Sequence, residues 1–308
     1  MDAETFDVAI VGGGAAGLSA ALVLGRARRR VVVIDAGAPR NAPAAHMQGF
    51  LSRDGMPPAE LLIAGRAEVS SYGVELVEDR VRTIDAGFVV RLAGGRVVKA
   101  RRVLIATGVD DELPAIPGVR ERWGRDLLHC PYCHGWEVRD QPIGVLGTQL
   151  GSAQHALLIR QWSADLTFFV HDHELSASEE SQLRARGIRI VRGEVARLVI
   201  ETDRITGVEL SDGQVLPRTA VFIRPANRPH ADGLLAGLGC ELDEGGFVKV
   251  DAAGQTSTLG VWAAGNVVDP RAQVITSAGA GSAAAIAINA DLVQEDVRLA
   301  VQEVATQR

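Results

Sequence analysis

The chain has 308 residues, a formal net charge of −6 at pH 7 and a hydrophobic fraction of 47%. This length can bury a large core and allows two domains, and the composition is that of a folded α/β protein rather than a disordered one. The acidic balance argues against nucleic-acid binding, which needs a clustered basic face. Three cysteines are too few for an extracellular disulfide framework. We therefore expect a cytoplasmic protein with no nucleic-acid or membrane partner.

The N-terminal segment predicts a dinucleotide-binding unit. The apolar strand FDVAIV runs into glycine, and a helical stretch (AAGLSAALVLGRA) and a second strand (RVVVIDAG) follow. Gly12, Gly14 and Gly17 form a G-x-G-x-x-G turn between strand and helix, where glycines let the backbone approach a pyrophosphate at the helix N-terminus. Asp35 ends the second strand, where an acid can bind a ribose hydroxyl. The acidic residues before the first strand exclude a signal peptide, which needs a basic flank.

Two later segments complete the same domain. RRVLIATGVDD is a strand that ends in Ala106, Thr107 and Gly108. LGVWAAGNVVDP is a strand that ends in Gly265 and Asn266, and a helix rich in small residues is predicted over 272–293. Small residues allow a helix and its backbone to come close to a bulky ligand.

A second strand-glycine-helix unit lies between these segments, in PIGVLGTQLGSAQHALLIRQ, and the strand LTFFVHDH follows it. The sequence therefore predicts an α/β fold with two dinucleotide-binding domains, the second inserted into the first. We expect a discontinuous first domain over 1–112 and 246–308 and an inserted domain over 113–245.

The stretch HCPYCHGWE holds two of the three cysteines, Cys130 and Cys133. A Cys-x-x-Cys pair can bind a metal, form a static disulfide or exchange electrons. A structural zinc site needs four ligands, and the chain has no second such pair, so we predict no metal site. Beside a dinucleotide-binding unit the pair is typical of a redox dithiol that is opened and closed by thiolate exchange.

With these motifs in order, the whole chain resembles the low-molecular-weight thioredoxin reductases. The resemblance implies the class II pyridine nucleotide-disulfide oxidoreductase architecture, in which each subunit has two Rossmann-like domains. It also implies that the subunit binds FAD and forms a homodimer. It implies that the FAD-binding residues are Gly12, Gly14, Ala15, Ala16, Gly17, Asp35, Ala36, Asn41, Ala106, Thr107, Gly108, Gly265, Asn266, Gln273 and Val274.

The same resemblance assigns the reacting groups. Cys133 would face the flavin, and Cys130 would exchange with the substrate sulfur. The reductases usually carry an acidic residue directly after the second cysteine, which donates and accepts the proton. This chain has His134 there, and an imidazole that titrates near neutral pH can do the same work.

The inserted domain departs from the reductases. Gln149 replaces a glycine of its phosphate-binding turn, and Asp172 and Glu174 stand where two arginines bind the 2′-phosphate of NADPH. Negative charge at that place argues against NADPH binding. Asn266 also replaces the usual aspartate. These changes resemble a branch of the family, the FAD-dependent dithiol oxidases that close disulfides in compounds such as holomycin and gliotoxin.

The resemblance therefore favours an FAD-dependent oxidoreductase that oxidises a small-molecule dithiol through Cys130 and Cys133. Oxygen would accept the electrons and hydrogen peroxide would form. One alternative is a reductase that takes electrons from NAD(P)H or ferredoxin and acts on a small disulfide or a thioredoxin-like protein. Another is a non-catalytic flavoprotein that senses redox state.

Overall fold

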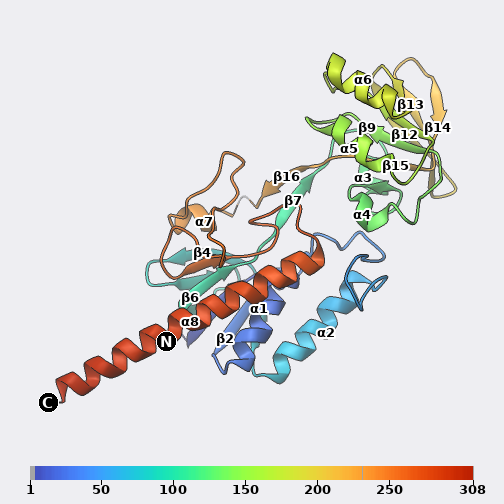
Figure 1. Ribbon diagram of the computed structural model, residues 1–308. Helices are drawn as coiled ribbons and strands as arrows, with labels where there is room; N and C mark the ends of the chain where they lie inside the picture. The colour runs from blue at the N-terminus through green and yellow to red at the C-terminus, as the bar shows by residue number, and fades with distance from the viewer. Residues whose placement is uncertain (1–3, 231, 308) are drawn as a thin grey trace. The chain divides into compact units, whose positions relative to one another are not determined.

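The computed structural model describes residues 4–230 and 232–307, which form two compact units (Figure 1). Unit 1 comprises Met1–Arg40, Ala59–Asp110 and Arg228–Arg308, and unit 2 comprises Asn41–Pro58 and Asp111–Asn227. Each unit alternates strands and helices around a mainly parallel sheet, so the predicted α/β fold with an inserted second domain is confirmed.

Unit 1 is built on a seven-stranded sheet with the order β3-β2-β1-β6-β5-β4, and β17 pairs with β6. Its elements are β1 (Glu4–Val11), α1 (Ala15–Arg26), β2 (Val31–Asp35), α2 (Pro58–Ser71), β3 (Glu75–Glu78), β4 (Val81–Asp85), β5 (Val89–Leu92), β6 (Val97–Ile105), α7 (Leu234–Gly237), β17 (Val261–Ala263) and α8 (Val274–Thr306). β1, β2, β3, β6 and β17 are parallel, whereas β4 and β5 form an antiparallel extension.

Alternate residues of β1 face opposite sides of this sheet, because successive side chains of a strand point to opposite faces. Val8 and Ile10 belong to the hydrophobic cluster shared with α1 and α8, and Ala9 and Val11 belong to the cluster on the other face. Leu234 and Cys240 are buried in this second cluster, so the segment that follows residue 228 covers one face of the unit 1 sheet.

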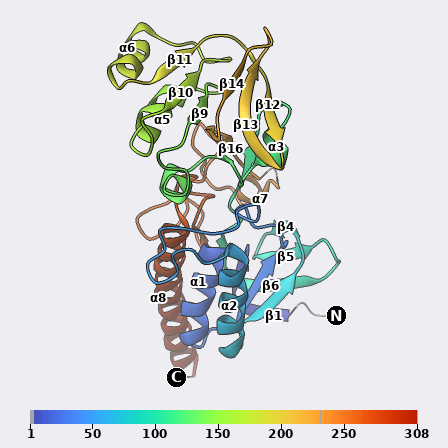
Figure 2. The same cartoon turned by 90° about the vertical axis from the view of Figure 1, so that its right-hand side faces the viewer.

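α1 and α8 pack unusually closely in unit 1, as both views show (Figures 1 and 2). A Cβ atom on Gly281 would overlap the carbonyl oxygen of Ala16, so only glycine allows the two backbones to approach this far. α8 continues to Thr306, beyond the predicted end at residue 293, because no glycine or proline follows to stop it. Among the described residues, no helix, α8 included, is apolar over a stretch long enough to span a membrane.

A cluster of ion pairs holds the middle of α8 to the sheet. The Arg101 guanidinium on β6 donates to Asp7 (2.8 Å), Glu295 (2.7 Å) and Asp296, and Arg29 donates to Asp296 (2.8 Å). Hydrogen bonds from Arg29 and Arg101 lower the pKa of Asp296. Burial raises the pKa of Glu295, but Arg101 and its neighbour outweigh this effect, so the pKa of Glu295 is also lowered.

Unit 2 has a five-stranded parallel sheet with the order β11-β10-β9-β15-β8, together with an antiparallel sheet of β12, β13 and β14. Its elements are α3 (Val119–Arg122), β8 (Leu127–Leu128), α4 (Pro131–His134), β9 (Ile143–Leu146), α5 (Ser152–Ile159), β10 (Leu166–Phe169), α6 (Ala177–Ala185), β11 (Arg189–Val191), β12 (Val195–Glu201), β13 (Arg204–Leu210), β14 (Val215–Pro217) and β15 (Ala220–Phe222). The chain passes between the units through β7 (Val109–Glu112) and β16 (Ala226–Pro229), which pair with each other.

The units differ from the predicted domains in three segments, of which residues 111–112 are a shift of the boundary by two positions. Residues 228–245 belong to unit 1, because their apolar side chains fill the second face of its sheet. Residues 41–58 belong to unit 2, where Pro43 lies directly against Gly124. Which cofactor each unit binds stays a prediction at this stage.

The Arg101 cluster gives a test of acid stability. The carboxylates of Glu295 and Asp296 have lower pKa values in the folded state than in the unfolded state. Their ionised forms therefore stabilise the folded state fully above the unfolded-state pKa values. This stabilisation is lost as the pH falls through the folded-state pKa values. We expect Arg101→Met to lower the free energy of unfolding at pH 7 by about 2 kcal/mol. The drop in Tm between about pH 5 and pH 3 should also become shallower.

The measurement is calorimetry of the variant and the wild type over this pH range. Arg91→Met is the matched control, because Arg91 pairs with Asp85 (2.6 Å) where both side chains are exposed, and such pairs contribute at most about 1 kcal/mol. An unchanged acid slope in Arg101→Met would contradict the assignment.

Candidate active site

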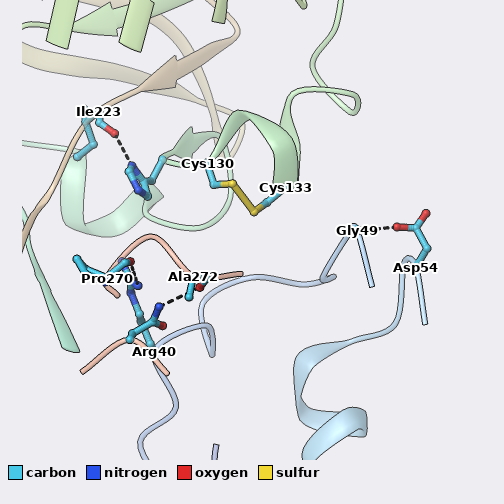
Figure 3. The surroundings of a disulfide bond; sticks show 10 residues. Arg40, Gly49, Asp54, Cys130, Cys133, Ile223, Pro270 and Ala272 are labelled. Atoms are coloured by element: carbon cyan, nitrogen blue, oxygen red, sulfur yellow. Dashed lines mark hydrogen bonds between the residues drawn. A yellow bond between two sulfur atoms is a disulfide. The ribbon is translucent and has the colours of Figure 1, made fainter. Parts of the chain in front are cut away.

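The dithiol lies on a single helical turn in unit 2. Cys130 is the N-cap of α4 and forms a disulfide with Cys133, with 5.2 Å between the Cα atoms (Figure 3). Pro131 occupies the first helical position, where its missing N–H costs nothing. The carbonyl of Cys130 accepts from the amides of Cys133 (3.2 Å) and His134 (3.1 Å). Cys130 thus lies at the N-terminus of α4, and both cysteines are half-buried.

Two exposed aromatic side chains flank the dithiol. Tyr132 is 62% exposed and Trp136 is 66% exposed, although both have partners that fix their orientation. Tyr132 packs edge-on against Trp162 at 5.5 Å, and the Arg139 guanidinium lies 3.9 Å from the centre of the Trp136 ring. Rigid aromatic rings at a surface are typical of binding sites. The sequence reasoning missed them, although both lie within the motif itself.

His134 directly follows Cys133 and ends α4. Burial lowers the pKa of His134, and the nearby Glu137 carboxylate opposes this only in part. The imidazole is therefore neutral near pH 7 and can accept a proton at the dithiol.

Two further histidines, His129 and His155, lie close to each other next to Cys130. The His129 Nδ1 atom is 3.2 Å from the carbonyl oxygen of Ile223 (Figure 3), and the His129 ring centre is 5.7 Å from that of His155 on α5. His155 is only 7% exposed, and in the described part of the chain neither of its ring nitrogens has a hydrogen-bond partner. Burial, followed by the His129 charge, lowers the pKa of His155 to about 3, so this ring stays neutral. Nothing in the sequence pattern indicated His155.

The third cysteine, Cys240, belongs to the other unit. It is 7% exposed, and its sulfur lies 3.5 Å from the Thr256 hydroxyl, as expected for a small buried residue. Among residues 4–230 and 232–307, no cluster of histidine, cysteine and acidic side chains could hold a metal ion.

The glycine turn of unit 1 has the geometry of a phosphate-binding turn. Gly12 has φ +106° and lies so close to the carbonyl of Ala106 that a side chain would not fit. Gly14 is the N-cap of α1, and a Cβ atom there would meet nothing within 4 Å. The turn is therefore packed on one side and open on the other, and the free amides of Ala15 and Ala16 begin the helix.

Asp35 closes this site at the end of β2. Its Oδ1 accepts from the Gly13 amide (3.1 Å), and its Oδ2 accepts from Arg66 on α2 (2.6 Å). A carboxylate fixed in this way beside the turn fits the ribose of a dinucleotide. Arg66 is a site residue that the sequence reasoning did not find, because its partner lies 31 positions away.

The other expected FAD residues of unit 1 lie at the same edge of the sheet. Ala106 follows β6, and Gly265 follows β17 with φ +84°. Because β1, β6 and β17 are parallel neighbours, their carboxyl ends bring these turns together with the start of α1. The expected residues gathered here are Ala36, which follows Asp35, and also Thr107, Gly108, Asn266, Gln273 and Val274. Asn41 lies in unit 2.

Asn266 shapes the approach to α8. Its side-chain amide donates to the carbonyls of Asp269 (3.0 Å) and Ala272 (2.9 Å), which holds the turn that leads to Gln273, the N-cap of α8. An aspartate cannot donate these bonds. An aspartate at position 266 would therefore lose both of these bonds, so Asn266 supports the local conformation of the turn.

The glycine turn of unit 2 is closed on itself. The Gln149 amide donates to the Ser152 hydroxyl (3.2 Å), and the Ser152 amide donates to the Gln149 carbonyl (3.1 Å). After β10, the side chain of Asp172 is 75% exposed, 3.1 Å from the His171 ring. The Nδ1 of His171 accepts from the Val195 amide (3.0 Å).

Comparisons with known proteins identify the family. Residues 6–285 match the family model "Pyridine nucleotide-disulphide oxidoreductase". The chain is 31% identical to "Thioredoxin reductase sirT" of Leptosphaeria maculans, over 95% of this chain and 96% of that protein. The crystal structure of HlmI superposes with a TM-score of 0.96 at 57% identity and covers 98% of this chain and 97% of that one. A putative thioredoxin reductase TrxB from Bacillus anthracis superposes with a TM-score of 0.89 at 34% identity, over 94% of this chain and 99% of that one.

The match over nearly the whole chain agrees with the redox disulfide on α4 and with the dinucleotide geometry of unit 1. The chain therefore belongs to the pyridine nucleotide-disulphide oxidoreductase family, and within it to the FAD-dependent oxidoreductases of the thioredoxin reductase type.

Proposed function

We propose that the protein oxidises a small-molecule dithiol to a disulfide and passes the electrons to oxygen, which becomes hydrogen peroxide. The observation that carries this proposal is the Cys130–Cys133 disulfide with an adjacent neutral base, in a unit whose nucleotide turn is closed and followed by an exposed acid. Asp172 would repel the 2′-phosphate of NADPH, and Gln149 would place a side chain where the backbone has to approach a pyrophosphate. The cysteine pair therefore remains able to exchange electrons, whereas the groups that would bind NADPH, the usual electron donor, are absent from unit 2.

Unit 1 is the proposed FAD site. The open side of Gly14, the amides at the start of α1 and the fixed Asp35 carboxylate fit the pyrophosphate and the adenosine ribose. Asn266, Gln273 and Val274 would lie along the rest of the cofactor. Bound FAD supplies an acceptor for two electrons that can pass them to oxygen.

The chain's own residues carry out the sulfur exchange. A substrate thiolate attacks the Cys130 sulfur, the Cys130–Cys133 bond breaks, and Cys133 leaves as a thiolate. The second substrate thiolate then attacks the substrate sulfur of the mixed disulfide, which releases the product and leaves both cysteines reduced. His134 accepts one of the two protons that the substrate thiols release, and the other stays on the Cys130 thiol. The Cys130–Cys133 disulfide would re-form when the pair gives two electrons to bound FAD and from there to oxygen, together with both protons. The overall balance is one dithiol and one O2 consumed for each disulfide and each H2O2 formed.

The flanking aromatic residues favour a small substrate with a flat apolar part. Tyr132 and Trp136 present ring surface beside the disulfide in orientations that Trp162 and Arg139 fix. Ring surfaces that are already ordered bind a planar ligand at low entropic cost.

The first test mixes the holoenzyme with a small dithiol under air and without nicotinamide. We expect peroxide and disulfide in equal amounts, and neither product from Cys130→Ser or Cys133→Ser. The control is an anaerobic titration of the bound flavin with NADH and NADPH. Rapid bleaching by either nucleotide at micromolar concentration, without peroxide from the dithiol, would instead show the reductase alternative.

The second test concerns the proton acceptor. Because burial lowers the pKa of His134, its basic form persists below the ordinary pKa, and activity should fall only as pH drops below about 6.5. We expect His134→Gln to lower kcat/KM by about 10²–10⁴ and to remove this acidic limb. The check is the pH profile of kcat/KM. If the pH profile of the variant kept the acidic limb of the wild type, a group other than His134 would be the proton acceptor.

The third test separates cofactor binding from folding. A side chain at Gly14 meets no atom of the chain, so Gly14→Val should fold normally but obstruct the pyrophosphate. We expect a flavin content at least about tenfold lower, equivalent to about 1.4 kcal/mol. The readout is flavin absorbance per chain, after circular dichroism has established folding. Gly237→Val is the matched control, because its Cβ also meets nothing and it lies on α7. Full flavin in Gly14→Val would place the cofactor elsewhere.

A further inference from the structure

His230 connects two parts of unit 1 that are far apart in the sequence. It directly follows β16, and its Nε2 atom lies 3.0 Å from the carbonyl oxygen of Thr107. Its Nδ1 atom lies 2.9 Å from the carboxylate of Asp110 in β7. The imidazole is therefore held in one orientation by contacts at both ring nitrogens.

Both partners of the His230 ring can only accept hydrogen bonds. A carbonyl oxygen and an ionised carboxylate have no proton to donate, so each of them needs an N–H group of the ring. A neutral imidazole has one N–H and one lone pair, and it can satisfy only one of the two. The geometry at His230 therefore fits the imidazolium, which donates through both nitrogens.

The charges near His230 also favour the imidazolium. Asp110 is the titratable group in contact with the ring, and its side chain is 71% exposed. Water therefore screens the ion pair, and its effect is modest. The carboxylate of Asp232 accepts from the Leu234 amide (3.0 Å). The charged residues close to His230 or Asp110 in the sequence are Arg228, Asp232, Asp111 and Glu112, and three of these four are acidic.

The Thr107 carbonyl belongs to the turn after β6, where the expected FAD residues gather. Gly108 has φ +78°, and glycine restricts the backbone less than any other residue. The peptide between Thr107 and Gly108 therefore needs an outside contact to fix its plane. A Cβ atom on Gly108 would meet nothing within 4 Å, so the turn is open here, as it is at Gly14.

The hydrogen bond from His230 supplies this contact. A trans peptide holds its C=O and its N–H on opposite sides. When the Thr107 carbonyl accepts from His230, the Gly108 N–H is turned away from the imidazole. The ring thus determines the direction in which this donor can bind a ligand.

We propose that His230 is a positioning residue of the FAD site, and that its doubly protonated ring fixes the Thr107–Gly108 peptide for cofactor binding. This inference rests on the proposed FAD site of unit 1. When the ring loses a proton, Asp110 keeps the remaining N–H, because a charged acceptor forms the stronger hydrogen bond. The Thr107 carbonyl then loses its donor and the peptide can rotate. FAD is therefore bound less tightly at alkaline pH than at neutral pH.

The first measurement is the protonation state of His230, from NMR of the holoenzyme with isotope-labelled histidine. At about pH 7.5 an unperturbed imidazole is about nine-tenths neutral. We expect both nitrogens of His230 to carry protons at this pH, and the spectrum of His230→Gln identifies its signals. Asp110→Asn is the control, because its amide can donate to Nδ1 and leave a neutral ring with the proton on Nε2. A neutral ring in the wild type at this pH would overturn the proposal.

The second measurement is the affinity for FAD at about pH 7 and about pH 9, from the fluorescence of released flavin. We expect the wild type to bind FAD about two- to tenfold more weakly at the higher pH, which is the effect of one hydrogen bond. His230→Gln and His230→Asn are a matched pair, since the Gln amide reaches the place of Nε2 and the Asn amide reaches that of Nδ1. His230→Gln should keep the Thr107 bond and the neutral-pH affinity at both pH values. His230→Asn should bind FAD at both pH values as weakly as the wild type does at the higher one.

The outcomes separate this inference from the proposed cofactor site. Circular dichroism and Tm establish that the variants are folded. If His230→Asn does not fold, Asp110→Asn takes its place and should bind FAD equally well at both pH values. The same pH dependence in every chain, with flavin bound, would overturn this inference alone. A wild type that takes up no FAD would overturn the proposed FAD site, and this inference with it.

Discussion

The contact between α1 and α8 positions the whole cofactor edge of unit 1. Gly281 has no room for a side chain beside the Ala16 carbonyl, so the two helices lie at the shortest separation that their backbones permit. Each helix begins at the carboxyl edge of the parallel sheet, α1 after Gly14 and α8 after Gln273. Their close packing fixes the distance between these two starting points. A larger residue at position 281 would therefore displace both helix starts together.

The two units contain the same kind of strand-turn-helix, with an open turn in unit 1 and a closed turn in unit 2. In unit 1 the turn is open at Gly14, and the acid after β2 is held in place by Arg66. In unit 2 the equivalent turn is filled by its own hydrogen bonds between Gln149 and Ser152. A turn whose amides are already paired within the chain has fewer donors left for a phosphate. Unit 2 also carries α4 and its disulfide.

Local patterns predicted the parts of the structure that local rules control. The glycine turn at Gly12 and the strand end at Asp35 follow from spacing alone. The fold class and the family also followed, because several motifs had to occur in one order along the chain.

The remaining features depend on contacts between distant residues. Arg66, His155 and the aromatic pair at Tyr132 and Trp136 carry no signal until the fold brings their partners near. The sequence assigned residues 228–245 to the inserted domain, whereas their contacts group them with unit 1, because Leu234 and Cys240 are buried against its sheet. The end of α8 was missed because its residues lack the small-residue pattern that identified its beginning.

The discontinuity of unit 1 has a consequence for synthesis on the ribosome. Every residue of unit 2 has been translated once Asn227 emerges, whereas β17 and α8, which complete the cofactor edge, come last. Domains tend to fold as they leave the ribosome, in the order in which they are made. In the nascent chain the two cysteines are therefore exposed before the elements that complete the FAD site have been synthesised. A chain truncated shortly after Asn227 would contain the cysteine pair but would lack a complete FAD site.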